Sequence, residues 1–210
     1  MTTMRRLVGP ALVLGLSLTL AACASVGGHD VGTEAAPAAT SSAAVPSASA
    51  TPSSGPRNEA DVMFATMMIP HHAQAIEMAK LVQSDPGVDP KVAALAQRIQ
   101  DAQSPEIAQM KGWLASWGED SDGSSMSHEG HGAGGGMMSE EDLDALEAAD
   151  GAEATKLFLE GMIEHHQGAV EMAKTQIAKG ANPDAKRRAQ AIVDAQNAEI
   201  VQMHGLLASS

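Results

Sequence analysis

Apolar residues recur at helical spacing in four long segments of the chain, separated by turns that contain proline, glycine and asparagine. Apolar positions three or four residues apart predict amphipathic helices over about residues 58–83, 90–117, 152–179 and 183–207. The predicted starts have helix-capping signals: Asn58 with Asp61 three residues on, and a proline directly after Asp89 and Asn182. A shorter helix is predicted from Ser139, which precedes three acidic residues. The pattern therefore predicts an all-α fold.

One stretch of the first long segment, residues 67–80, returns in the third at residues 161–174. Both copies contain a methionine, an adjacent histidine pair and a Glu-Met-Ala-Lys tail at the same spacing. The likeness extends over the following helix, so each repeat, about residues 58–117 and 152–208, should be one supersecondary unit. Two antiparallel helical hairpins predict an up-down four-helix bundle.

The first copy reads Phe-x3-Met-Ile-x-His-His-x2-Ala-x-Glu-Met-Ala, and its second helix reads Ile-x-Asp-Ala-Gln-x2-Glu-Ile-x-Gln-Met. This combination resembles the DUF305 family, over about residues 57–208. The resemblance implies a ferritin-like helical bundle in an exported bacterial protein, and copper binding, which is associated with some members.

The first 56 residues should lie outside the bundle. Residues 1–22 have a basic start and a short apolar run, as in an export signal, and end in Leu-Ala-Ala before Cys23. This ending resembles a bacterial lipobox, which predicts cleavage before Cys23 and lipidation of its thiol; the alternative is an ordinary signal peptide. Residues 23–56 are rich in Ala, Ser, Thr and Pro, and we expect a disordered tether. The predicted location is the outer face of the cytoplasmic membrane.

Composition narrows the class of partner. Without Arg5 and Arg6 of the signal, 11 of the 13 basic residues remain against 26 acidic ones. A surface this acidic repels nucleic acid and anionic lipid and suits the collection of cations. The single cysteine excludes a disulfide framework or a cysteine-based zinc site. Predicted partners are therefore a metal ion, the membrane through the lipid anchor alone, and either an envelope protein or a second copy of the chain.

The histidine pairs are the strongest candidate ligands in the bundle. On a helical wheel His71 and His165 fall on the apolar stripe, whereas His72 and His166 lie nearer the flank, as ligands or as solvated residues. Methionines three and four residues before each pair, or on the same stripes, extend the candidate set: Met68, Met78, Met162, Met172, Met110 and Met203. Imidazole with thioether favours copper as Cu(I), Cu(II) or both. The alternatives are hydrogen-bonded core histidines and methionines that only fill the core.

A second candidate site lies in the glycine-rich connection at residues 118–138. Met126, His128 and His131 are predicted copper ligands there, because histidine-rich tracts are a metal-binding composition. The alternative is an ordinary solvated loop.

These patterns predict a non-catalytic lipoprotein that binds copper for sequestration, tolerance or delivery. Because imidazole binds metal in its neutral form, we expect affinity to fall below about pH 6. The alternative is an interaction module of the cell envelope with structural histidine pairs. An oxidase or reductase is disfavoured because the Glu-x-x-His motif of di-iron bundles is absent from the sequence.

Overall fold

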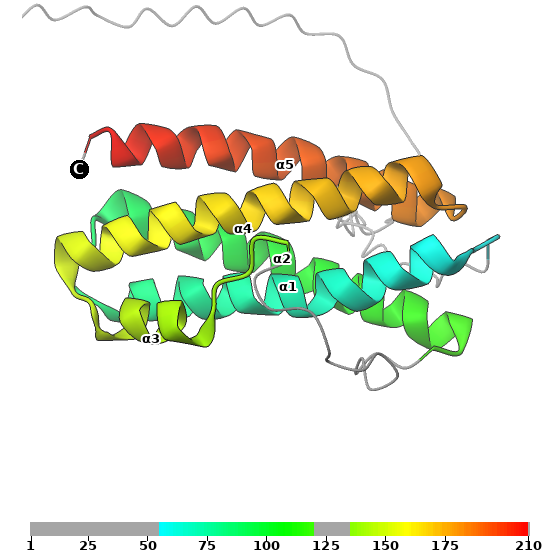
Figure 1. Ribbon diagram of the computed structural model, residues 1–210, viewed down its shortest axis with the longest axis horizontal. Coiled ribbons are helices and arrows are strands. Elements are labelled where there is room, and N and C mark those ends of the chain that lie inside the picture. The colour runs from blue at the N-terminus through cyan, green and yellow to red at the C-terminus, as the bar shows by residue number, and fades with distance from the viewer. Residues whose placement is uncertain (1–54, 120–134, 210) are drawn as a thin grey trace, which may run out of the picture. The chain divides into compact units, whose positions relative to one another are not determined.

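The computed structural model describes residues 55–119 and 135–209 and contains five helices (Figure 1). These are α1 (Glu59–Ser84), α2 (Pro90–Trp117), α3 (Glu140–Ala148), α4 (Gly151–Lys179) and α5 (Pro183–Leu207). No strand occurs in the described residues, so the predicted all-α class is confirmed. None of the described helices has the length and apolar content needed to cross a membrane. The export signal, Cys23 and the candidate ligands Met126, His128 and His131 lie outside the described residues.

The helices begin where their capping signals predict. Asn58 and Asp61 form a reciprocal capping box at the start of α1. Asp89 accepts a hydrogen bond from the backbone N–H of Lys91, with Pro90 in the first turn of α2. At the start of α5, the side chain of Asn182 accepts hydrogen bonds from the backbone N–H groups of Asp184 and Ala185, and Pro183 again lies in the first turn. Because caps are local interactions, the sequence alone predicts them well.

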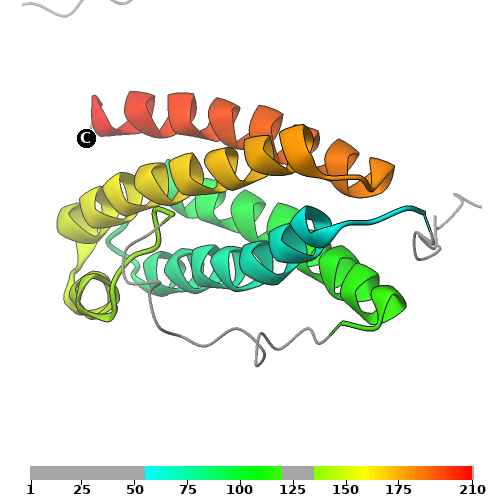
Figure 2. The same cartoon turned by 45° about the vertical axis from the view of Figure 1, so that its right-hand side comes forward.

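The four long helices form two hairpins, α1 with α2 and α4 with α5, that pack through α1 and α4 (Figures 1 and 2). Asn58 at the start of α1 donates a hydrogen bond to the carbonyl of Lys179 at the end of α4, at 2.8 Å, so these helices are antiparallel. The α2 and α4 helices run in the same direction, because α2 ends at one end of the bundle and α4 begins at the other (Figure 1). The prediction of strict up-down alternation is therefore wrong: the directions are up, down, down, up.

The repeats pack reciprocally. Asp61 of α1 is fully buried and accepts backbone hydrogen bonds from Ala181 at 3.0 Å and Asn182 at 3.1 Å, and a side-chain hydrogen bond from Gln176. At the matching position of α4, Thr155 accepts a longer hydrogen bond, 3.4 Å, from the backbone N–H of Asp89. Each repeat therefore holds the interhelical turn of the other, which aligns the middles of α1 and α4.

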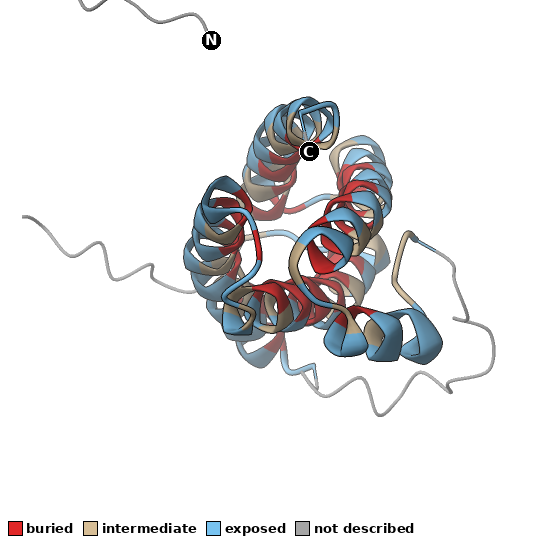
Figure 3. Ribbon diagram, turned by 90° about the vertical axis from the view of Figure 1, so that its left-hand side faces the viewer, coloured by how far each residue is buried: buried red, intermediate tan, exposed pale blue. Residues whose placement is uncertain are grey.

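The apolar core consists of two clusters, one toward each end of the bundle. One contains the end of α1, the start of α2, the start of α4 and Met203 of α5; the other contains the start of α1, the end of α2, the end of α4 and the start of α5. Viewed down the bundle, buried positions face inward on all four long helices, and α3 lies outside them (Figure 3). The positions between the two clusters are polar.

Candidate metal centre

A layer of polar side chains crosses the bundle between the two apolar clusters. We call it the polar layer, and its members come in repeat-related pairs: His71 and His165, His72 and His166, Gln103 and Gln196, Glu106 and Glu199. The four histidines and both glutamines are buried, and the two glutamates are partly buried. Burying polar groups in a bundle core costs free energy unless they have hydrogen-bond or metal partners, so the partners of each member decide its role.

The outer histidines are held by carboxylates in the same way in both repeats. His72 Nε2 lies 2.8 Å from Glu106 Oε2, and His166 Nε2 lies 2.8 Å from Glu199 Oε2. A carboxylate only accepts hydrogen bonds, so Nε2 donates and Nδ1 keeps its lone pair. Glu106 also accepts a hydrogen bond from Arg188 at 3.0 Å. Carboxylate-bound imidazole is the arrangement that orients a metal-ligating histidine in many metalloproteins.

The inner histidines meet at the bundle axis. The ring centroids of His71 and His165 are 3.7 Å apart with the planes inclined at 40°. His71 Nε2 donates to the carbonyl oxygen of Gly135 at 2.9 Å, which again leaves Nδ1 with its lone pair. Neither ring nitrogen of His165 makes a well-formed hydrogen bond among the described residues, although the backbone of His71 lies close enough to act on the ring.

Unsatisfied polar atoms concentrate in the polar layer. Within the described residues, the buried polar side-chain atoms without a hydrogen-bond partner all belong to this layer except Gln176 Oε1: the Nδ1 atoms of the four histidines, Nε2 of His165, and Oε1 of Gln103 and Gln196. Such atoms cost about 1–3 kcal/mol each when nothing binds them. A bound cation would use the nitrogen and oxygen lone pairs, so the residues present fit a metal ion.

The imidazoles are not arranged around an ion position. In the described residues, no three His, Cys, Asp or Glu side chains are grouped closely enough to hold a metal. His71 and His165 stack instead, so coordination requires a ring rotation, thioether ligands, or both. Soft thioether sulfur is available on both sides of the layer, which is the ligand type that Cu(I) prefers.

Burial keeps the inner imidazoles uncharged. Desolvation lowers the pKa of His71 to about 4, although the hydrogen bond to Gly135 acts in the opposite direction. Desolvation, with repulsion from the other histidines, also lowers the pKa of His165 well below its usual value. Both rings are therefore in the metal-binding form at neutral and mildly acidic pH. The expectation that binding weakens from about pH 6 is corrected for these two residues, because their surroundings exclude water.

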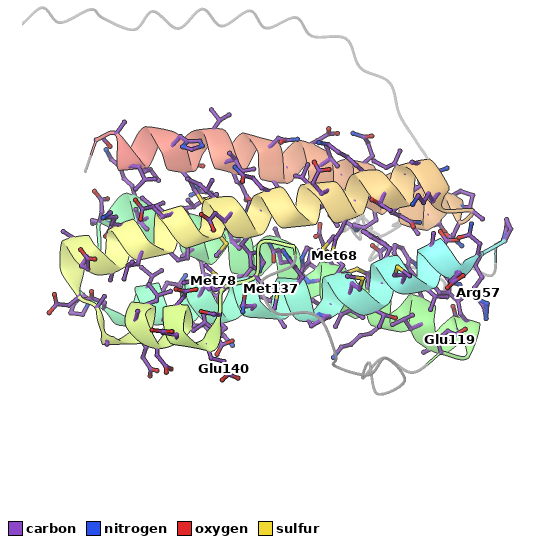
Figure 4. The ribbon with its side chains drawn as sticks, in the orientation of Figure 1. Arg57, Met68, Met78, Glu119, Met137 and Glu140 are labelled. Carbon is purple, nitrogen blue, oxygen red and sulfur yellow. The ribbon has the colours of Figure 1, made fainter. Side chains whose placement is uncertain are left out.

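A backbone segment at residues 135–138, which we call the strap, covers the inner histidines from one side. Gln74 clamps it by a pair of 2.9 Å hydrogen bonds to the backbone N–H and carbonyl of Met138. The strap crosses α4 at Gly168, where a Cβ would lie 1.5 Å from the carbonyl oxygen of Gly135. Along the bundle in Figure 4, Met137 of the strap lies between Met68 and Met78 of α1.

The predicted methionine ligands divide among three places. Met68 and Met110 are fully buried in one apolar cluster, and Met78, Met162 and Met203 are fully buried in the other. Met172 is half-buried and lines a surface groove instead. Five of the six therefore lie in the apolar clusters on either side of the polar layer, and Met172 also reaches the surface.

The structure corrects the expected exposure of the outer histidines. His72 and His166 are fully buried, whereas a single-helix wheel leaves them nearer the flank. The wheel fails because α2 and α5 cover that flank and bring Glu106 and Glu199 against the rings. Sequence reasoning missed the role of these two glutamates, although they occupy matching positions of the repeat. It also missed Gly135 and Gln74, whose contacts connect residues far apart in the chain.

Comparison with known proteins agrees with the repeat pattern. The model of the family described as a domain of unknown function, DUF305, matches residues 61–207. A DUF305 fragment from Deinococcus radiodurans is 34% identical with a TM-score of 0.67, covering 74% of this chain and 99% of its own. A DUF305 protein from Streptomyces coelicolor, named as a presumed secreted protein, is 36% identical with a TM-score of 0.65, covering 71% and 93%.

CopM, solved in a Cu(II)-bound form, is 33% identical with a TM-score of 0.61, covering 71% of this chain and 96% of its own. Structures of CopM in Cu(I)-bound and silver-bound forms are also similar. No curated protein matches the chain. Since the family model spans more than half of the sequence, this chain belongs to the DUF305 family.

Proposed function

We propose that this protein binds copper, as Cu(I), Cu(II) or both, at the polar layer, and that it sequesters or delivers the ion without chemical turnover. One observation carries the proposal: four buried imidazoles in a bundle core have Nδ1 atoms without partners among the described residues, and carboxylates or a carbonyl hold three of the opposite nitrogens. The flanking thioethers supply soft ligands suited to Cu(I). The similarity to copper-bound and silver-bound CopM supports the choice of metal.

The proposal extends to the setting of the domain. We place the mature protein at the outer face of the cytoplasmic membrane, anchored by lipid on Cys23 after removal of residues 1–22. The similarity to a DUF305 protein named as secreted supports export. We also assign α1, α2, α4 and α5 to a ferritin-like bundle, which the up, down, down, up order of their directions supports.

Competition titration with Cu(I) and Cu(II) tests the function. The full chain is compared with a variant in which His71, His72, His165 and His166 are all replaced by Gln, and thermal unfolding of both is measured without metal. Because loss of even a supporting partner costs about 10- to 100-fold in metal affinity, we expect loss of the four imidazoles to weaken copper binding by about 100-fold or more.

The competing assignment is an interaction module in which the histidines only satisfy core hydrogen bonds, and the hydrogen bonds to Glu106 and Glu199 favour it. That assignment predicts a lower melting temperature for the variant with unchanged copper binding. Such a result would overturn the copper-binding proposal.

A further inference from the structure

A surface groove lies between the start of α1 and the end of α4. The α3 helix lies at the opposite end of these two helices (Figure 1). Its volume is about 440 Å³, and three methionines line it: Met63 and Met67 from α1 and Met172 from α4. Met63 is 40% exposed, and the other two are half-buried. Three thioethers from two helices therefore border one solvent-accessible hollow.

The repeat shows what occupies the corresponding place on the other half of the bundle. By the offset that relates His71 to His165, the three groove methionines correspond to Leu157, Gly161 and Met78. There Met78 is fully buried, and the side chain of Met138 fills the space beside Gly161, where a Cβ would lie 2.8 Å from its sulfur. The α3 helix packs on that end of α1 and α4 (Figures 1 and 2).

The two halves therefore carry different side chains at equivalent positions. Where this face is covered, the equivalent positions hold leucine, glycine and one buried methionine, and Met138 of the strap fills the space beside the glycine. Where the same face is open to solvent, it has two additional methionines at positions 63 and 67. Residues four apart on a helix are neighbours, so Met63 and Met67 lie on one face and border the hollow with Met172.

We propose that this groove is a second metal site, in which the sulfur atoms of Met63, Met67 and Met172 bind a soft monovalent cation, Cu(I) or Ag(I). Thioethers are neutral and soft, so they select these ions over Zn²⁺ or Mg²⁺. Phe64 forms part of the apolar lining, and the charged residues of the lining are Glu59 and Lys179. This site lies outside the polar layer and contains no histidine, so metal binding in the groove does not depend on the polar layer.

The groove adjoins the cover of the polar layer. A second hollow, lined by Gly135, Gly136, Glu164 and Glu171, shares Met172 and Thr175 with the groove. The carbonyl oxygen of Gly135 accepts the hydrogen bond from His71. A cation held by Met172 would therefore lie on the surface that leads to the strap over the inner histidines.

Methyl NMR with silver tests the site directly. The full chain is labelled with ¹³C at the methionine ε-methyl groups and titrated with silver nitrate in chloride-free buffer. The signals of Met63, Met67 and Met172 should shift together as silver is added, and they should report one bound ion in the groove. A variant with all three replaced by Leu keeps similar side-chain volumes, so it should fold, and it should bind one Ag(I) fewer.

The polar layer is tested separately by the variant with Gln in place of His71, His72, His165 and His166. If the groove site is independent, its methyl signals shift in that variant with an affinity within about threefold of wild type. Unchanged metal binding by that variant outside the groove would then contradict the proposed function and leave the groove site standing. Groove methyl signals that do not move at several equivalents of silver, or an unchanged stoichiometry in the leucine variant, would overturn the inference.

Discussion

At the scale of residues, the environment of each imidazole decides what its nitrogen atoms can do. The carboxylates of Glu106 and Glu199 fix the proton of His72 and His166 on Nε2, so Nδ1 remains available. Burial lowers the pKa of His71 and His165, which keeps both rings neutral. Among the described residues, the core thus has four imidazole Nδ1 atoms without a hydrogen-bond partner.

The two carboxylates should determine metal affinity without being ligands. Replacing Glu106 and Glu199 with Gln preserves shape but weakens the hydrogen bonds that orient His72 and His166. We expect copper affinity to fall by about 10- to 100-fold, as for other supporting carboxylates. Competition titration measures it, with Glu171→Gln as the matched control, because Glu171 is exposed and pairs with Lys174. Equal affinities in the Glu106/Glu199 variant and the control would show that the carboxylates do not orient ligands.

At the scale of elements, sequence patterns predict the helices themselves better than the contacts between distant parts of the chain. Capping by Asn58, Asp89 and Asn182 is local, so the starts of α1, α2 and α5 were predicted within a residue or two. The strap was not predicted, because it depends on contacts between residues 64 positions apart, such as Gly135 with His71. The strap can lie against α4 only because residue 168 is glycine. In the sequence, Gly168 does not differ from an ordinary helical glycine.

Gly168→Ala should lower the free energy of unfolding, whereas most Gly→Ala substitutions in helices raise it. An exposed helical Gly→Ala change stabilises by about 1 kcal/mol. At Gly168 the added methyl group would collide with the carbonyl of Gly135, so we expect a net loss of stability or release of the strap. Urea unfolding and hydrogen exchange at residues 135–138 measure these effects. Gly112→Ala is the control, since nothing lies within 4 Å of its added Cβ. Stabilisation of both variants alike would show that the strap does not contact α4.

The contact between the repeats can be tested at Asp61. Its buried carboxylate accepts hydrogen bonds from Gln176 and from the backbone of the α4–α5 turn. Asp61→Ala leaves these donors unpaired and should destabilise the fold by about 3 kcal/mol. Thr155→Ala removes the weaker equivalent contact, 3.4 Å long, and should cost about 1 kcal/mol or less. Urea unfolding compares them, and a smaller loss for Asp61→Ala than for Thr155→Ala would contradict the assigned roles.

At the scale of the whole molecule, the polar layer separates the two apolar clusters of the core. The repeated histidine pairs predict candidate ligands within the bundle, and the repeat predicts the two helical hairpins that carry them. The pairing of His72 with Glu106 could not be predicted, because it depends on how α2 covers the flank of α1. The direction of α4 likewise depends on where the preceding connection ends.

The buried histidines should make the metal-free protein sensitive to mild acid. Above about pH 6.5 His71 is neutral in both the folded and the unfolded chain, so it does not affect stability. As the pH falls from 6.5 toward about 4, the unfolded chain takes up a proton that the folded chain excludes, and stability decreases. The loss from His71 alone is on the order of 3 kcal/mol. Urea unfolding at several pH values measures it, and His71→Asn should flatten the dependence; an equally steep dependence in that variant would refute the assignment.

The central claim is that imidazole nitrogens in the middle of the bundle bind the metal. The most direct measurement is ¹⁵N NMR of the histidine side chains in the full chain during titration with Ag(I), whose nuclei couple to bound nitrogen. The account predicts that Nδ1 signals of the polar layer shift and show coupling to silver, also when Met126, His128 and His131 are replaced by Ser. Silver-coupled signals confined to His128, His131 or the exposed His204, with the polar layer unchanged, would contradict it.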